Sequence, residues 1–347
     1  MKIRTIAICA SQVPFRSGGA EILVASLQSE LIRRGYRVEI IQLPFKWYPR
    51  NQILKGCLAW RLLDLTQSDG EPIDLVIATK FPSYIVKHPN KVTWLTHQFR
   101  QVYDQFGTPF SDYSDCPEDN AYRDAIKMID DQTLRESRRL FTISRNTSDR
   151  LARFNNLTGA PLYHPPKLAG RYRSDGYGDY VFTVSRLDRS KRLDLLIHAM
   201  THVRSGARLV IAGTGPEHQP LAEMIEKLDL GEKVTLAGFV SDDDLLRLYA
   251  GCCAVAYVPF DEDYGYVTLE AFASEKPVIT AADCGGVLEF VEDNITGCVT
   301  DGQPISLAAQ IDELWQNRDR AAALGRAGKE RVRNISWDNV TGQLLGL

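Results

Sequence analysis

The chain of 347 residues is long enough for two domains that each bury their own core. Hydrophobic residues make up 44% and charged residues 24%, as in ordinary globular proteins, and no apolar run approaches the roughly 20 residues that cross a bilayer. The net charge of −3 and the lack of a dense basic patch argue against nucleic-acid binding. Seven cysteines without a C-x-x-C pair argue against a disulfide framework and a zinc site, so a reducing compartment fits.

Charge is divided unevenly along the chain. Residues 1–170 contain 23 Lys and Arg against 17 Asp and Glu, whereas the remainder contains 18 against 27. The first half is basic and the second acidic, which suggests that the halves have different tasks. The N-terminus, MKIRTIAICAS, lacks a small-residue cleavage site, so we expect it to form a first strand and the protein to be cytoplasmic.

Short apolar runs alternate with amphipathic helical stretches from the N-terminus onward. Residues 3–10 (IRTIAICA) predict a strand, residues 17–35 have helical periodicity and end on Gly35, and a second strand follows at 36–43. Further strands are expected at 73–79, 91–96 and 138–144.

A Pro- and Gly-rich stretch at 161–179 interrupts this alternation, which then restarts. The second run of expected strands comprises residues 180–185, 207–213, 233–239, 253–259, 276–280 and 297–300. Short apolar strands separated by helices indicate parallel sheets covered on both faces. The sequence therefore predicts two doubly wound α/β domains, Rossmann-like and facing each other across a cleft, with a joint near residue 170.

Loops that follow strands deserve inspection because ligands of open parallel sheets bind beyond the carboxyl ends of the strands. In the first such loop, Gly18 and Gly19 precede a helix, where glycine permits close backbone approach and the helix start offers N–H groups to an anion. The pair does not match G-x-G-x-x-G, and a tight turn is the alternative explanation.

The loop SRLDRSK places two cations, Arg186 and Lys191, around a helix start, an arrangement that suits a diphosphate. The alternative is a solvated basic loop whose cations pair with Asp188 and Asp194.

The loop DEDYGYVTLE, residues 261–270, brings Glu262 beyond the strand at 253–259. Gly265 permits a close backbone approach, and a helix that begins near Val267 would offer its first amides to a phosphate. Glu270 is expected in the first turn, where its carboxylate could accept hydrogen bonds from a ribose diol. Alternatively, Glu270 only complements the helix dipole.

The segment EDYGYVTLEAFASEKPVI resembles the E-x-F-G-x-x-x-x-E-A-x-x-x-G-x-P-V signature of family-four retaining glycosyltransferases, the group 1 glycosyl transferases of the GT-B fold. The resemblance extends over nearly the whole chain. It includes the N-terminal Gly-Gly-x-Glu, SRLDRSK, LVIAGTGPE, LAGFVSDDDLLRLYAGC and CGGVLEFVEDNITG. It implies an acceptor-binding domain at 1–170, a nucleotide-sugar-binding domain at 171–335, and a helix at 336–347 that crosses back to the first domain.

The resemblance also implies roles for individual residues. Glu262 would bind hydroxyls of the donor sugar, Glu270 the nucleotide ribose, and Arg186 and Lys191 the diphosphate leaving group. His97 would face the donor sugar, although a lone histidine at a strand end is more often structural. The remaining implied donor contacts are Gly18, Gly19, Gly213, Gly215, Phe239, Val240, Gly265 and the amides of Tyr266, Val267 and Thr268.

Some positions depart from the family pattern. Arg192 stands where the family usually has glycine after the lysine, and Glu275 with Lys276 replaces a small residue and glycine before PVI. None of these changes removes a charged group of the expected site. The turn after Lys191, however, is expected to differ in shape.

The resemblance implies a metal-independent enzyme without a cofactor, because Arg186, Lys191 and helix amides would stabilise the departing diphosphate. No D-x-D pair stands at a strand end, and the acidic run at 242–244 is expected to belong to a helix cap. Retention of configuration is likewise implied, with a nucleoside diphosphate sugar as donor and a glycan or lipid-linked glycan as acceptor. A catalytically silent nucleotide-sugar binder and a GT-B enzyme of another reaction are the alternatives.

The acceptor side has one basic, aromatic segment, residues 45–65 (FKWYPRNQILKGCLAWRLLDL), with no acid before Asp64. Its composition suits a surface that touches anionic lipid, which would make the protein peripheral at the inner membrane face. A core helix with a solvated basic face is the alternative. The aromatic and polar segment 100–124 is a candidate for shaping the acceptor site.

Overall fold

The computed structural model describes residues 3–16 and 18–347, which divide into two compact units. Unit 2 comprises Leu168–Ile335, and unit 1 comprises the residues up to Lys167 together with Ser336–Leu347. The sequence placed these joints after residues 170 and 335. Ser17, the first residue of the predicted helical stretch, lies outside the described residues.

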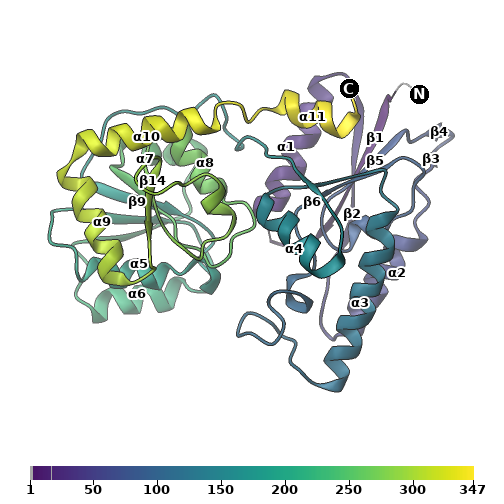
Figure 1. Ribbon diagram of the computed structural model, residues 1–347, viewed down its shortest axis with the longest axis horizontal. Helices are drawn as coiled ribbons and strands as arrows, with labels where there is room; N and C mark the ends of the chain where they lie inside the picture. Colours follow the sequence, from purple (N-terminus) through teal and green to yellow (C-terminus); the bar gives the residue numbers. More distant parts are fainter. Residues whose placement is uncertain (1–2, 17) are drawn as a thin grey trace. The chain divides into compact units, whose positions relative to one another are not determined.

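The sheet of unit 1 consists of parallel strands in the order β2-β1-β5-β6-β7-β8 (Figure 1). Because β1 lies between β2 and β5, the chain crosses over the sheet after β2. A short antiparallel pair, β3 and β4, lies within that crossover. The strands are β1 Thr5–Gln12, β2 Arg37–Pro44, β3 Gln67–Ser68, β4 Glu71–Pro72, β5 Leu75–Ala78, β6 Lys91–Leu95, β7 Arg139–Thr142 and β8 Ala160–Pro161.

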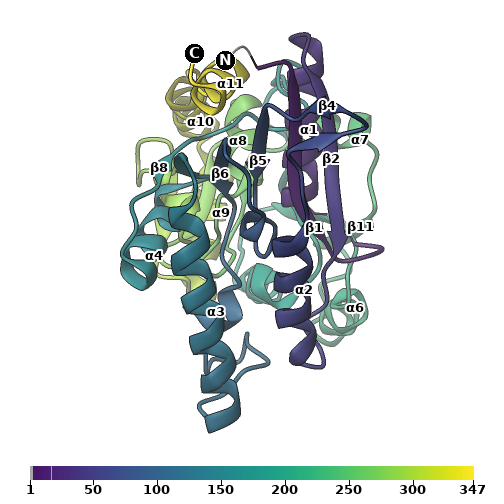
Figure 2. The same cartoon turned by 90° about the vertical axis from the view of Figure 1, so that its right-hand side faces the viewer.

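Helices cover both faces of this sheet. Ala7 and Cys9 of β1 belong to a core cluster that includes side chains of α2 and α3, which lie in front of the strands in Figure 2. Ile6 and Ile8 alternate with them and are buried on the opposite face. The helices are α1 Gly19–Arg33, α2 Asn51–Leu62, α3 Pro117–Arg135 and α4 Arg145–Asn155, with 3-10 turns η1 Ser83–Ile85 and η2 Arg100–Val102.

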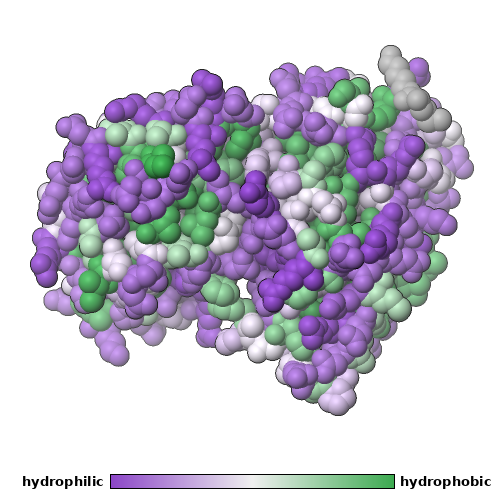
Figure 3. All heavy atoms as spheres, in the orientation of Figure 1, coloured by the Kyte–Doolittle hydropathy of each residue, from purple (hydrophilic) through white to green (hydrophobic). Residues whose placement is uncertain are grey.

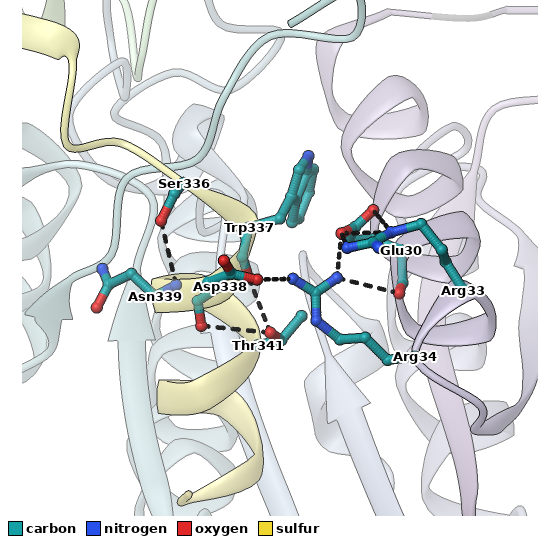
Figure 4. A network of polar contacts seen from close by, with 8 residues as sticks. All are labelled: Glu30, Arg33, Arg34, Ser336, Trp337, Asp338, Asn339 and Thr341. Carbon is teal, nitrogen blue, oxygen red and sulfur yellow. Dashed lines mark hydrogen bonds and ion pairs between the residues drawn. The ribbon is translucent and has the colours of Figure 1, made fainter. Parts of the chain in front are cut away.

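The last helix, α11 (Trp337–Leu345), packs within unit 1. Ser336 caps it, and Arg34 at the end of α1 pairs with both Asp338 of α11 and Glu30 of its own helix (Figure 4). Arg139 of β7 donates hydrogen bonds of 2.7 and 3.0 Å to two carbonyls in the last turn of α11. Side chains from both α1 and the sheet therefore fasten the C-terminal helix.

The sheet of unit 2 is also parallel, in the order β11-β10-β9-β12-β13-β14. Its strands are short and mostly buried, as the apolar runs predicted, except the edge strand at 234–238, in which only Val234 is buried. They are β9 Tyr180–Val184, β10 Arg208–Ala212, β11 Val234–Gly238, β12 Ala254–Ala256, β13 Val278–Ala281 and β14 Gly297–Thr300.

Side chains cap the starts of two helices of unit 2. Ser241 caps α7 by accepting a hydrogen bond from the Asp244 amide at 3.1 Å, which confirms that the acidic run at 242–244 belongs to a helix start. The helices are α5 Leu193–Met200, α6 His218–Lys227, α7 Asp242–Gly251, α8 Tyr266–Ala273, α9 Pro304–Gln316 and α10 Arg318–Val332, with 3-10 turns η3 Arg189–Lys191 and η4 Gly286–Glu289.

The basic segment at 45–65 leads into and forms α2. Trp60 is buried, Arg61 holds Glu136 through two hydrogen bonds of 2.7 and 2.8 Å, and Arg50 pairs with the buried Asp119. Two of the four basic groups thus already have carboxylate partners, which favours the core-helix alternative over a membrane surface.

Hydrophilic side chains cover most of the visible face of each unit (Figure 3). No helix among residues 3–16 and 18–347 is both long enough and apolar enough to cross a bilayer.

Candidate functional site

Two of the predicted loops lie at the same edge of the unit 2 sheet. The first follows β9 and contains η3, and the second follows β12 and leads into α8. Because β9 and β12 are neighbouring parallel strands, their carboxyl ends meet at one edge. The Phe260 amide donates a hydrogen bond of 2.8 Å to the Ser190 carbonyl, so the two loops are directly joined.

Lys191 and Glu262, which are 71 positions apart, form an ion pair between the Nζ and Oε2 atoms. Both side chains are about one-fifth exposed, at 20% and 19%. Tyr257 donates a second hydrogen bond to the same carboxylate oxygen at 2.8 Å. The structure therefore brings together two residues for which the sequence predicted separate roles on one ligand, and it pairs Lys191 with Glu262 instead of Asp194.

Arg186 pairs with Asp188 through a hydrogen bond of 2.8 Å and an ion-pair contact of 2.7 Å. Asp188 also caps η3 by accepting from the amide and hydroxyl of Ser190. Burial alone would raise the pKa of Asp188, but the hydrogen bonds from Ser190 and Arg186 hold that pKa below its usual value. Arg186 is thus a half-exposed guanidinium beside a carboxylate that stays charged.

The backbone around Glu262 is held by the loop after β13. The Glu262 amide donates to the Cys284 carbonyl at 3.2 Å, and the Glu262 carbonyl accepts from the Gly286 amide at 2.7 Å. A Cβ atom at Gly286 would lie 2.5 Å from the Asp263 carbonyl oxygen, so only glycine fits there. The motif CGG was visible in the sequence, but its task of positioning the Glu262 loop was not predicted.

Gly265 is the N-cap of α8, with φ at +81°. The helix begins at Tyr266, one residue before the expected start at Val267. This shift places Glu270 in the second turn, so the prediction of a first-turn position was wrong. The Thr268 amide already donates to the Gly265 carbonyl at 3.0 Å, and binding an anion would require it to share or break that bond.

Glu270 accepts hydrogen bonds on both carboxylate oxygens. Tyr249 of α7 donates to one oxygen at 2.7 Å, and Tyr172, from the segment before β9, donates to the other at 3.2 Å. The second-turn position and these partners weigh against a role that only complements the helix dipole. Sequence reasoning missed both tyrosines, because Tyr172 lies 98 positions and Tyr249 lies 21 positions from Glu270 in the sequence.

Gly213 and Gly215 fulfil a packing requirement. A Cβ atom would lie 1.8 Å from the Ser185 carbonyl oxygen at Gly213 and 2.3 Å from the Leu187 carbonyl oxygen at Gly215. The loop after β10 is thereby fitted onto the loop after β9, next to Arg186. Beyond β11, Phe239 is 83% exposed and Val240 is half-buried.

At the two positions that depart from the family pattern, the backbone has a conformation that favours glycine. Arg192 has φ at +49° and Glu275 has φ at +56°, both in the left-handed region. Arg192 compensates by donating to the Val258 carbonyl at 2.7 Å and by pairing with Asp283. The turn after Lys191 therefore has a left-handed residue at Arg192, a conformation that glycine adopts without strain.

In unit 1, Gly18 is the N-cap of α1 and Gly19 its first residue. The Gly18 amide donates to Glu21 at 2.9 Å, and the other oxygen of Glu21 accepts from Lys80 at 2.5 Å. One helix-start amide is therefore already occupied by a carboxylate of the same helix.

His97 follows β6, and its Nδ1 atom lies 2.7 Å from the Gln98 carbonyl oxygen. A buried polar chain supports the loop after it: Gln98 donates to Asn155 at 2.8 Å, and Asn155 contacts the Tyr103 hydroxyl at 3.2 Å. Tyr103 in turn donates to the buried Asp130 at 2.7 Å.

Within the described part of the chain, no group of three or more His, Cys, Asp and Glu is arranged to hold a metal.

Comparison with known proteins agrees with this arrangement. Residues 168–331 match the family model described as glycosyl transferases group 1. The second unit of the chain is therefore similar to members of this family. That match contains Arg186, Lys191, Glu262 and Glu270 but not His97.

Two curated relatives illustrate the family. The chain is 36% identical over 190 residues to the GDP-mannose-dependent alpha-(1-6)-phosphatidylinositol monomannoside mannosyltransferase of Mycobacterium tuberculosis, covering 51% of this chain and 49% of the relative. It is 30% identical over 169 residues to human alpha-1,3/1,6-mannosyltransferase ALG2, covering 44% and 40%. The chain spans about half the length, or less, of these curated relatives.

Solved structures extend the similarity to the whole fold. Sucrose-phosphate synthase from Thermosynechococcus elongatus superposes with a TM-score of 0.77 at 18% identity, covering 99% of this chain and 98% of that one. Anabaena HepE in complex with UDP and glucose gives 0.73 at 18% identity, covering 99% and 100%. The chain therefore has the GT-B fold, as predicted.

Proposed function

We propose that this chain is a retaining, metal-independent glycosyltransferase that moves a sugar from a nucleoside diphosphate sugar to a glycan or lipid-linked glycan. The observation that carries this proposal is the cluster of Lys191, Glu262 and Tyr257 beside Arg186, at the carboxyl edge of a parallel sheet in a group 1 family domain. The mannosyltransferase relatives make GDP-mannose the first donor to test.

The proposed reaction begins with the departure of the diphosphate from the anomeric carbon. Arg186 and Lys191 would stabilise the negative charge that grows on this leaving group. For Lys191 this requires a partial exchange of partners, because its ammonium group is paired with Glu262. Glu262 would then be released to accept hydrogen bonds from the donor sugar, while Tyr257 keeps one of its oxygens in place.

Glu270 would hold the ribose diol, and the α8 start beside Gly265 would contact the diphosphate. The acceptor hydroxyl would attack from the face that the diphosphate leaves and would pass its proton to a departing phosphate oxygen. Bond formation at the anomeric carbon would thereby occur with retention of configuration. Unit 1 would bind the acceptor in this proposal.

Donor identity is tested by thermal-shift measurements with GDP-, UDP- and ADP-sugars, because a bound ligand raises the melting temperature. Donor hydrolysis or transfer is then measured with the stabilising donor, with and without excess EDTA. Activity that persists in EDTA and a product of retained anomeric configuration, identified by NMR, are expected. Activity that requires added manganese would overturn metal independence, and binding without any turnover would favour a silent nucleotide-sugar binder.

A further inference from the structure

The segment that connects the units, read from sequence only as a Pro- and Gly-rich joint, is fastened along the surface of unit 2. Its residues 175 and 178 donate backbone hydrogen bonds of 2.9 Å to the carbonyls of Ala250 and Gly251 at the end of α7. Tyr177 donates its hydroxyl to the Glu275 carbonyl at 2.7 Å, just after α8. The segment therefore has a defined path between the ends of two helices.

Lys276, which is buried at the start of β13, forms the centre of this attachment. Its ammonium donates to Ser174 at 3.1 Å and to the Gly176 carbonyl, and it lies 4.2 Å from the centre of the Tyr177 ring. Burial lowers the pKa of Lys276. The buried ammonium of Lys276 donates its hydrogen bonds to one segment. It holds that segment in place, because breaking either bond would leave a buried polar group without a partner.

Tyr172, at the start of this fastened segment, lies within hydrogen-bond distance of Glu270. The Tyr172 hydroxyl lies 3.2 Å from one carboxylate oxygen, the Tyr249 hydroxyl lies 2.7 Å from the other, and the two rings meet edge to face at 6.0 Å. Burial and the nearby charge of Glu270 raise the pKa of both tyrosines. Both hydroxyls therefore stay protonated and act as neutral donors to the carboxylate.

We infer that Tyr172 is a positioning residue for nucleotide recognition, so that the connecting segment is part of the donor site. The inference rests on the proposed function, in which Glu270 binds the ribose. The hydroxyl groups of Tyr172 and Tyr249 hold the two carboxylate oxygens of Glu270, the group that accepts the hydroxyls of the ribose in the proposed function. With a tyrosine fixing each oxygen, the carboxylate plane is set before the nucleotide arrives, and less conformational freedom is lost on binding.

The test combines a conservative variant with a ligand that lacks the groups concerned. Binding of GDP and UDP, and of their 2′,3′-dideoxy forms, is measured by calorimetry for native protein, Tyr172→Phe and Glu270→Gln. Tyr172→Phe is expected to weaken the ribonucleotide by about 3- to 10-fold, since one hydrogen bond to a charged group is lost. The same variant should bind the dideoxy nucleotide as tightly as native protein does, and KM for the donor should rise while kcat is kept.

Tyr180→Phe is the matched control, because its hydroxyl donates to a backbone acceptor, the Leu248 carbonyl, at 2.9 Å instead of to Glu270. It should bind both nucleotide forms normally. Lys276→Met, if it folds, should weaken ribonucleotide binding in the same direction as Tyr172→Phe by freeing the segment.

The outcomes separate the two proposals. Equal weakening of both nucleotide forms by Tyr172→Phe, or no weakening of either, would overturn the role of Tyr172. If Glu270→Gln loses the preference for the ribonucleotide while Tyr172→Phe keeps it, only the role of the connecting segment fails. If Glu270→Gln also keeps that preference, the ribose site itself lies elsewhere.

Discussion

Glu262 and Glu270 lie eight positions apart in unit 2, yet the structure holds them in different ways. Glu262 is on a loop and shares one carboxylate oxygen between a lysine ammonium and a tyrosine hydroxyl. Glu270 is on a helix and receives a neutral hydroxyl on each oxygen. A cationic partner must be redistributed when an anionic ligand arrives, whereas neutral donors can stay. The comparison therefore predicts that Glu262 acts in a step that changes charge and that Glu270 acts in binding.

The largest expected effect falls on the Lys191 and Glu262 pair. Lys191→Ala should lower kcat by about 100-fold or more, because a charge that stabilises the leaving group is lost. Glu262→Gln should also lower kcat by a large factor while the free nucleoside diphosphate still binds, since misplacement of the reacting sugar affects rate. Steady-state kinetics with saturating donor measure both, with Lys227→Ala, an exposed position of α6, as control. Near-normal turnover in Lys191→Ala would place the diphosphate elsewhere.

Glu270 should show the opposite pattern. Glu270→Gln removes an interaction made equally in the ground state and the transition state, so KM for the donor should rise more than kcat falls. The affinity for the free nucleotide should fall by about 1–3 kcal/mol, the penalty for leaving a buried ribose hydroxyl without its partner. Calorimetry with the nucleotide alone gives this number. A kcat effect as large as that of Glu262→Gln would remove the proposed distinction between the two carboxylates.

Asp130 of α3, like Glu270, is a carboxyl group that accepts a hydrogen bond from a tyrosine hydroxyl. Desolvation raises its pKa to about 7, although Tyr103 donates to it. A carboxyl whose folded pKa is raised stabilises the fold below its ordinary pKa near 4 and loses that contribution as pH rises through 7. The unfolding free energy of native protein should therefore fall between pH 5 and 8 by on the order of 2 kcal/mol more than that of Asp130→Asn. The unfolding free energies are measured by urea denaturation at each pH. If they change with pH in the same way for native protein and Asp130→Asn, the raised pKa of Asp130 is contradicted.

The smallest expected effect concerns two residues with a left-handed backbone. Arg192 follows η3, which ends at Lys191, and Glu275 follows α8, the helix that carries Glu270. At both positions the glycine variant should be more stable than the alanine variant by roughly 0.5–1 kcal/mol, because both lose the side chain but only glycine tolerates a positive φ without strain. Urea denaturation of the four variants measures the difference. An alanine variant as stable as its glycine counterpart would mean that the turn relaxes to another backbone conformation.

The sequence predicted the elements better than it predicted the contacts among site residues. Most parallel strands were predictable because they are short runs of apolar and β-branched residues between helices, whereas the exposed two-residue strand β8 was not predicted. The Lys191–Glu262 pair and the Tyr172–Glu270 bond join positions 71 and 98 residues apart, and no local pattern encodes such a meeting. The positive φ of Arg192 could not be predicted either, since its compensation comes from carbonyls and a carboxylate on other loops. For Glu270, a shift of one residue in the helix start was enough to make the expected turn wrong.

The attachment of α11 has a consequence for how the chain is made. Unit 2 is an uninterrupted stretch, Leu168–Ile335, whereas unit 1 needs Ser336–Leu347 to receive the contacts of Arg34 and Arg139. A ribosome that works from the N-terminus therefore releases all of unit 2 before unit 1 can be finished. The first half to be synthesised must wait, with the surface that later binds α11 uncovered, until the last twelve residues of this sequence have emerged.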